Sequence, residues 1–167
     1  MTDQDLPVPE RTVDELFGDY ARILSELRTM GVIRSANAPA GDYAEWLFQR
    51  ALGGEIVDSH SVRSYNLTLP DGDRVQVKAR VVSDPPGKGQ LQASPFRSWD
   101  FEFAGLLLLR DSDYTVLRAA MVPVDVVRAS ATFRTHVNGS VVQLTETLFG
   151  HVQSVDLTER LKTAANG

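Results

Sequence analysis

The sequence predicts a domain of the α+β or mixed α/β class, in which helices come first and a mainly antiparallel sheet follows. Three observations lead to this fold class. Apolar residues recur at helical spacing over residues 13–30. Alternating apolar and polar residues flank the turn sequence Pro70-Asp71-Gly72, which is typical of a β-hairpin. Residues 101–109 form an almost unbroken apolar run, which is typical of a buried central strand.

Two helices are expected before the sheet. Thr12 and Glu15 have the spacing of a capping box, in which the Thr hydroxyl accepts a helix N–H and the Glu reaches back to the cap. The first helix is therefore expected over residues 13–30. A second helix at about 42–52 carries one stripe of apolar side chains and ends at the glycine pair that begins with Gly53.

The overall composition is that of an ordinary folded domain. The chain has 167 residues, enough for one hydrophobic core, and we expect a single domain over residues 12–167 behind a flexible arm at 1–11. It has no cysteine, no basic-then-apolar leader and no apolar run long enough to span a bilayer, so we expect a cytoplasmic protein without a membrane partner. The net charge of −5 argues against general phosphate attraction but leaves room for a local basic face.

The hairpin is the best-defined element, because two signals select the same register. A three-residue loop at Pro70-Asp71-Gly72 places Leu67 opposite Val75 and Asn66 opposite Gln76. Side-chain alternation over 61–69 and 73–81 gives the same pairing. One face is then apolar, and the other gathers a set of polar side chains: Ser64, Asn66, Thr68, Gln76, Lys78 and Arg80. A half-exposed hairpin with a solvated polar face explains this pattern without any function.

The remaining elements are smaller. Residues 82–98 carry Pro, Gly, Ser and Lys and are expected to form a long loop, a kind of segment that is often functional or mobile. A strand at 114–122 and a short helix at 123–130 are expected next. Asn138-Gly139 predicts a two-residue hairpin turn, and the capping pattern at 156–159 predicts a final helix.

At this point the sequence resembles the PD-(D/E)XK nuclease superfamily. The resemblance is carried by GDYAEWLFQRALGG, by SYNLTLPDGDRVQVKAR and, after the loop, by WDFEFAGLLLLRDSDYTVLRAAMVP, and it covers about residues 40–125. The shared pattern is a helix bearing a Glu, a hairpin, and a strand ending in (D/E/Q)-x-K. The resemblance implies a restriction-endonuclease-like fold, with a central mixed sheet flanked by helices.

By position, the resemblance implies a phosphodiesterase site made of Glu45, Asn66, Gln76 and Lys78. Glu45, Asn66 and Gln76 would surround Mg²⁺, or Mn²⁺ in its place, and Lys78 would serve the attacking water. Asn66 stands where the family has an acid, and Gln76 is also neutral, so weakened DNA cleavage is expected. Substitute carboxylates are available in the neighbourhood, and the sequence does not select among Asp58, Asp73, Asp100 and Glu102.

Three basic residues are expected to touch a DNA backbone if this interpretation holds: Lys88, Arg80 and Arg97. Two other interpretations stay open. The domain could be a catalytically inactive relative that binds nucleic acid or a protein partner, or an unrelated α+β domain whose hairpin mimics the motif. The Asn138-Gly139 hairpin could serve dimerisation, DNA contact, or only the closure of the fold.

Overall fold

A computed structural model describes residues 10–11, 13–34, 38–57 and 64–166, with the backbone alone described for residues 13–18. The chain divides into two units, Met1–Pro39 and Ala40–Gly167. The first unit contains helix α1 (Val13–Thr29), where the sequence predicted a helix. The second unit begins at Ala40, well after the predicted start of the domain at residue 12. Residues 1–9 of the predicted arm lie outside the described residues.

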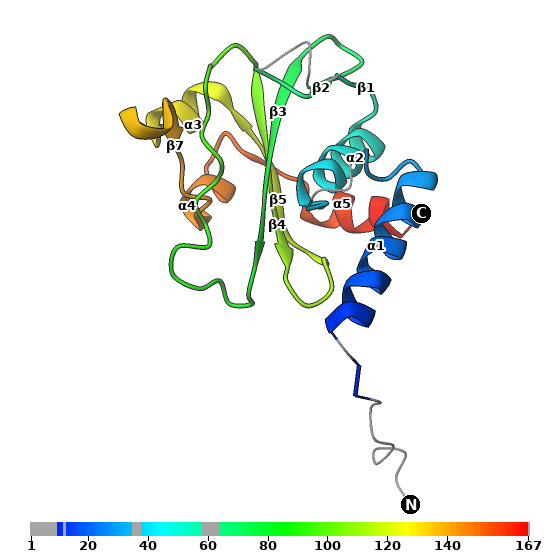
Figure 1. Cartoon of the computed structure of the whole chain (residues 1–167). Helices are drawn as coiled ribbons and strands as arrows, with labels where there is room; N and C mark the ends of the chain where they lie inside the picture. Colours follow the sequence, from blue (N-terminus) through cyan, green and yellow to red (C-terminus); the bar gives the residue numbers. More distant parts are fainter. Residues whose placement is uncertain (1–9, 12, 35–37, 58–63, 167) are drawn as a thin grey trace, which may run out of the picture. The chain divides into compact units, whose positions relative to one another are not determined.

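The second unit is a mixed α+β domain around a six-stranded sheet (Figure 1). The strands lie in the order β1-β2-β3-β4-β5-β8, and all neighbours are antiparallel except β3 and β4, which are parallel. The strands of this sheet are β1 (Glu55–Ile56), β2 (Leu67–Thr68), β3 (Arg74–Val82), β4 (Phe103–Arg110), β5 (Val116–Pro123) and β8 (Val155–Asp156).

Helices and the segment between β3 and β4 cover the two faces of this sheet (Figure 1). One face packs against two helices, α2 (Ala40–Leu52) and α5 (Thr158–Ala165). The other face is covered by α3 (Val124–Ala129), by α4 (Glu146–Phe149) and by the segment between β3 and β4. A small hairpin of β6 (Thr132–Arg134), the 3-10 turn η1 (Thr135–Val137) and β7 (Gly139–Val141) packs on that segment, where Ser140 bridges to Phe96. Among the helices of the described ranges, none combines the length and apolarity that crossing a bilayer requires.

The core forms on both sides of β4, which explains its apolar run. Leu107 and Leu109 face α2 and α5, whereas Leu106 and Leu108 face the opposite layer. Gly105 lets α2 approach closely, because a Cβ at this position would lie 3.1 Å from two ring atoms of Phe48. This close packing fixes α2, which carries Glu45, against the sheet.

The connection between the parallel strands β3 and β4 is an extended segment rather than the usual helix. The sequence predicted a long loop here. In the structure the segment is a packed layer, with Ala93 and Phe96 buried in the core and isolated bridges joining Gln92 to Gln143 and Phe96 to Ser140.

The two hairpins differ in how well their sequences predicted them. The β2–β3 register is confirmed, since Leu67 pairs with Val75. The β2 ladder is much shorter than predicted, however, and residues 58–63 lie outside the described residues. In the second hairpin the predicted two-residue turn is wrong, because η1 lengthens the connection and Asn138 closes it in a left-handed conformation with φ of 47°.

Candidate functional site

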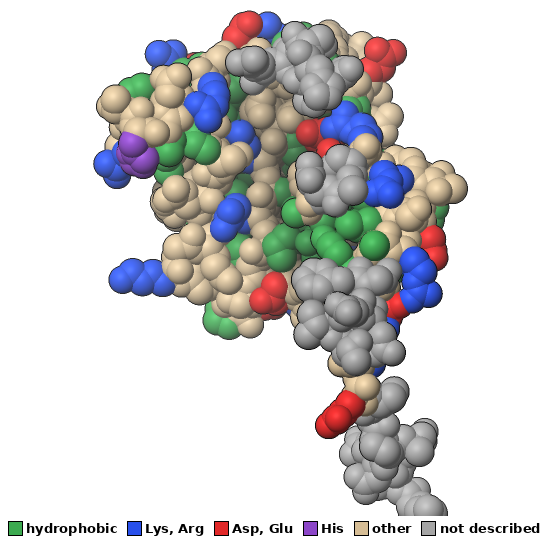
Figure 2. Space-filling model, in the orientation of Figure 1, with side chains coloured by type: hydrophobic (Ala, Val, Ile, Leu, Met, Phe, Trp, Pro, Cys, Tyr) green, Lys and Arg blue, Asp and Glu red, His purple; other side chains and the backbone are tan. Residues whose placement is uncertain are grey.

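The candidate site lies along the edge of β3 that faces β2. β2 pairs with β3 at only two positions, Leu67 with Val75 and Thr68 with Arg74. From Gln76 onward, β3 pairs with β4 on one side, and no other described strand lies on its other side. Figure 2 shows a hollow along this face of the domain, with Lys and Arg side chains on both of its sides.

Asn66 is the residue at which β2 leaves β3. Its Oδ1 accepts a hydrogen bond from the Val77 backbone N–H at 2.6 Å, in the place where a strand carbonyl would continue the ladder. Its Nδ2 donates to Glu45 Oε1 at 3.0 Å. Because only the carbonyl end can accept from Val77, the amide nitrogen must face Glu45. The short β2 ladder therefore has a local cause in the Asn66 side chain.

Glu45 is a buried carboxylate, with 8% of its surface exposed. It lies on α2 next to Ala44, at the border of the buried stripe that the helical spacing predicted. The structure thus brings together Glu45 and Asn66, two of the four residues that the resemblance selects, from positions 21 residues apart. Further contacts also engage Glu45.

The donor set around Glu45 does not fit the divalent cation that the resemblance implies. Asn66 turns its N–H groups toward the carboxylate, and its carbonyl oxygen is already hydrogen-bonded. Hard cations need several oxygen donors with negative charge among them. Across the part of the chain that the structure describes, no group of three or more His, Cys, Asp and Glu side chains is placed to hold a metal.

Among the substitute carboxylates that the structure describes, Asp100 and Glu102 are engaged by Arg74. Glu102 accepts two hydrogen bonds from the Arg74 guanidinium, at 2.7 and 3.2 Å, and one from the Arg74 backbone N–H. Asp100 lies 3.0 Å from the same guanidinium. Asp73 follows directly after the hairpin turn, and Asp58 is outside the described residues. Glu102 and Asp100, which come just before β4, therefore hold Arg74 of β3 rather than joining Glu45.

Lys78 lies on the face of β3 that points away from α2. Its Nζ donates to Ser94 Oγ at 3.0 Å and to the Pro95 carbonyl at 3.2 Å, and it lies 5.0 Å from the centre of the Phe96 ring. Burial, and then the positive charge of Arg97, lower the pKa of Lys78 to about 8. Gln76 precedes it on the same face and is half-buried.

Two arginines extend the positive charge around Lys78. Arg80 Nε donates to the Gln90 carbonyl at 2.9 Å. Arg97 Nη1 donates to the carbonyls of Val137 and Asn138 at 2.7 and 2.9 Å. We call these three residues, Lys78, Arg80 and Arg97, the basic face. None of them forms an ion pair with a carboxylate of the described residues, and their acceptors are neutral oxygens.

Sequence reasoning found the charged members of this surface but not the groups that position them. Alternation along β3 placed Lys78 and Arg80 on one face. Ser94 and Pro95 hold the Lys78 ammonium from the connecting segment, and no periodicity or motif in the sequence signals that contact. Lys88, the third predicted DNA contact, lies exposed in the turn that ends at Gln90.

No protein-family model matches this chain, and no curated protein matches it in sequence. The fold and the site geometry therefore carry the functional argument.

Proposed function

We propose that this chain is a nucleic-acid-binding domain of the restriction-endonuclease-like class, which binds DNA through the basic face along the β3 edge. The observation that carries the proposal is the absence of any described carboxylate partner for Lys78, Arg80 and Arg97 in a chain of net charge −5. Phosphate contacts from Lys and Arg dominate the affinity of proteins for DNA.

The state of Lys78 supports an anionic ligand at this face. A desolvated ammonium group beside another cation is unfavourable, which is why the pKa of Lys78 falls to about 8. A phosphate placed near Lys78 and Arg97 would offset this repulsion and restore the full charge of the lysine. The binding energy would therefore be concentrated at these two residues.

Metal-dependent phosphodiester hydrolysis is the second candidate. It is favoured by one observation, namely that the buried carboxylate of Glu45 reaches β3 through Asn66, while a lysine with a pKa of about 8 lies on the opposite face of the same strand. Because the donor set does not fit a divalent cation, we place binding before cleavage. Incubation of supercoiled plasmid and single-stranded DNA with the protein and Mg²⁺ or Mn²⁺ separates the two candidates, and cleavage lost in Lys78→Ala would establish hydrolysis.

DNA binding is tested by fluorescence anisotropy with a labelled duplex of about two helical turns at several salt concentrations. Arg97→Ala removes one predicted phosphate contact, and Arg160→Ala removes the same charge from the exposed surface of α5. We expect Arg97→Ala to weaken binding about tenfold and to lower the salt slope by about one. Arg160→Ala should leave both quantities unchanged.

Two results would overturn the proposal. One is the lack of salt-sensitive binding to either duplex or single-stranded DNA at micromolar protein. The other is equal loss of affinity in the two variants, which would show that only net charge matters.

A further inference from the structure

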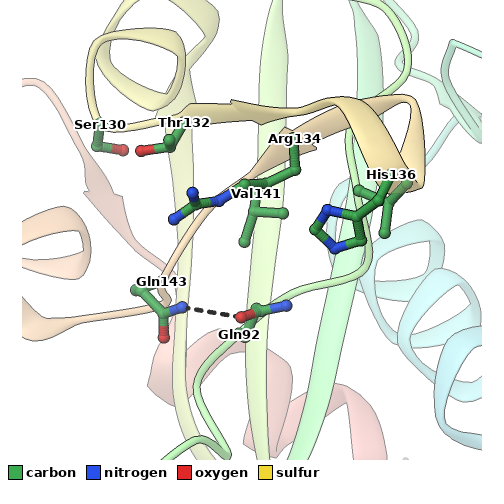
Figure 3. Close-up of a pocket in the computed structure, with 8 residues that line it drawn as sticks. Gln92, Ser130, Thr132, Arg134, His136, Val141 and Gln143 are labelled. Carbon is green, nitrogen blue, oxygen red and sulfur yellow. Dashed lines mark hydrogen bonds between the residues drawn. The ribbon is translucent and has the colours of Figure 1, made fainter.

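A small pocket lies beside the β6–η1–β7 hairpin, outside the residues that the resemblance selects. Its volume is about 240 Å³. Six polar side chains from the hairpin region and the connecting segment line it: Gln92, Ser130, Thr132, Arg134, His136 and Gln143. Val137 and Val141 complete the lining with apolar surface (Figure 3). The pocket therefore combines cationic, hydroxyl and amide groups around a small apolar patch.

The electrostatics of the pocket favour an anion. None of the lining residues is Asp or Glu, although acidic residues outnumber basic ones by 22 to 17 in the whole chain. Arg134 is exposed and forms no ion pair with any described carboxylate. Elsewhere in the same layer, Arg118 is held between Glu146 and Asp156, so carboxylates are available to this layer but do not reach the pocket.

The side chains are arranged around a common space. In Figure 3 the Arg134 guanidinium lies on the side of Thr132 and Gln143, and the His136 ring lies on the other side of Val141. Gln143 Nε2 donates to Gln92 Oε1 at 3.4 Å, a long bond that leaves further donor and acceptor positions of both amides for a ligand.

We propose that this pocket binds a phosphate monoester group. A planar guanidinium gives paired hydrogen bonds to phosphate oxygens, and the hydroxyl and amide groups can complete its shell. The volume is below the roughly 300 Å³ at which pockets for drug-sized ligands begin. It therefore suits a phosphate with part of its attached sugar rather than a whole dinucleotide.

The pocket is connected to the basic face by direct contact. Arg97 donates to the carbonyls of Val137 and Asn138, and Val137 also lines the pocket. A phosphate monoester can therefore reach it from two sources, a 5′-phosphorylated strand end lying on the basic face or a free nucleotide. The strand-end source rests on the proposed DNA-binding function, whereas the free-nucleotide source does not.

The pocket is tested by titrating the full chain with deoxyadenosine monophosphate, inorganic phosphate and deoxyadenosine, followed by two-dimensional NMR. We expect the monophosphate and inorganic phosphate to shift the Arg134 and His136 signals, and deoxyadenosine to leave them unchanged. Arg134→Gln replaces the guanidinium with a shorter, neutral amide, and it should weaken monophosphate binding at least tenfold. Arg160→Gln on α5 is the matched control and should bind like the parent chain.

Labelled oligonucleotides distinguish the two sources. A 5′-phosphorylated strand that binds several-fold better than its 5′-hydroxyl form, with the difference lost in Arg134→Gln, identifies the strand end. Monophosphate binding without such a difference identifies a free nucleotide. The proposal is overturned if neither phosphate compound binds at millimolar concentration, or if Arg134→Gln binds the monophosphate as well as the parent chain does. The titration with the monophosphate uses no DNA, so the two proposals can fail separately.

Discussion

Two sets of cations in this domain differ in what they bind. In the first set, each arginine bridges two carboxylates at distances between 2.6 and 3.3 Å. Its members are Arg74 with Asp100 and Glu102, Arg110 with Asp84 and Asp113, and Arg118 with Glu146 and Asp156. In the second set, the basic face, every described polar acceptor is a neutral carbonyl or hydroxyl oxygen.

The difference shows that the described carboxylates are unevenly distributed: they lie beside the arginines of the first set and not beside the basic face. The carboxylate-bridged arginines join separate elements, such as α4 and β8 through Arg118, and their pKa values are raised by their partners. The pKa of Lys78 moves in the opposite direction. Cations of the first kind are neutralised within the fold, whereas the described contacts of the second kind provide no compensating negative charge.

The largest effect is expected from adding a carboxylate to the β3 edge. Asn66→Asp replaces the N–H that donates to Glu45 with an oxygen, so two carboxylates would lie about 3 Å apart in place of the present hydrogen bond. We expect a loss of about 3 kcal/mol in the free energy of unfolding without metal. Millimolar Mg²⁺ or Mn²⁺ should restore part of it, because the two carboxylates then share a cation.

Urea unfolding with and without each metal measures this effect. Asn66→Ser is the control, since it also removes the amide bonds but adds no charge, and its stability should not respond to metal. If Asn66→Asp unfolds at the same urea concentration with and without Mn²⁺, the prediction is wrong. The Asn at position 66 is then not the reason that the β3 edge lacks a cation site.

The second effect concerns the pH dependence that an unpaired lysine gives to stability. The pKa of Lys78 is about 8 in the folded chain and near 10.5 when unfolded, so the unfolded chain binds this proton more tightly. Stability should therefore increase as the pH rises from about 8 to about 10.5. After allowance for partial solvent contact, we expect a gain of about 2 kcal/mol.

Lys78→Met keeps most of the unbranched side chain and removes the titrating ammonium group. The difference in unfolding free energy between the parent chain and this variant, measured from pH 7 to 10, isolates the contribution of Lys78 from other alkaline titrations. A difference that stays constant over this range would contradict the lowered pKa. DNA affinity of the parent chain should fall above pH 8, and that of Lys78→Met should stay flat.

The third prediction compares one arginine from each set, Arg118 from the carboxylate-bridged arginines and Arg97 from the basic face. Arg118→Met removes both bridges to Glu146 and Asp156, and we expect it to cost about 1 kcal/mol of stability because its partners are largely exposed. Its DNA affinity should not change. Arg97→Met should show the reverse, with little loss of stability and about tenfold weaker binding. Thermal unfolding and anisotropy on the same preparations decide this, and weaker DNA binding in Arg118→Met would remove the distinction.

The sequence was informative where the pattern is local. Turn chemistry at Pro70-Asp71-Gly72 predicted the pairing of Leu67 with Val75, and the apolar run predicted β4. The early end of β2 was not predictable, because it depends on Asn66 accepting from Val77 and donating to a helix 21 residues earlier. Such contacts depend on the packing of α2 on the sheet and leave no periodic signal.

The same limit applies to the segment between β3 and β4. Its composition predicted a loop, since Pro and Gly interrupt any period, but the buried Ala93 and Phe96 make it a wall of the site. The pocket residues Arg134 and His136 lie two residues apart in the sequence, but they share a pocket with Gln92 only because the hairpin folds against this segment. The sequence therefore did not predict the contacts between residues of different secondary-structure elements.

The smallest effect is expected at Lys88. This lysine lies exposed in a turn stabilised by Gln90, whose side chain accepts from the Gly87 N–H and from Ser83. The ammonium group of an exposed lysine on a turn attracts phosphate from a distance, and salt screens this attraction. Lys88→Ala should therefore weaken DNA binding about twofold at low salt and leave it unchanged near physiological salt. Anisotropy at both salt concentrations measures this. A tenfold loss at physiological salt would instead place Lys88 within the basic face and move the DNA path toward the end of β3.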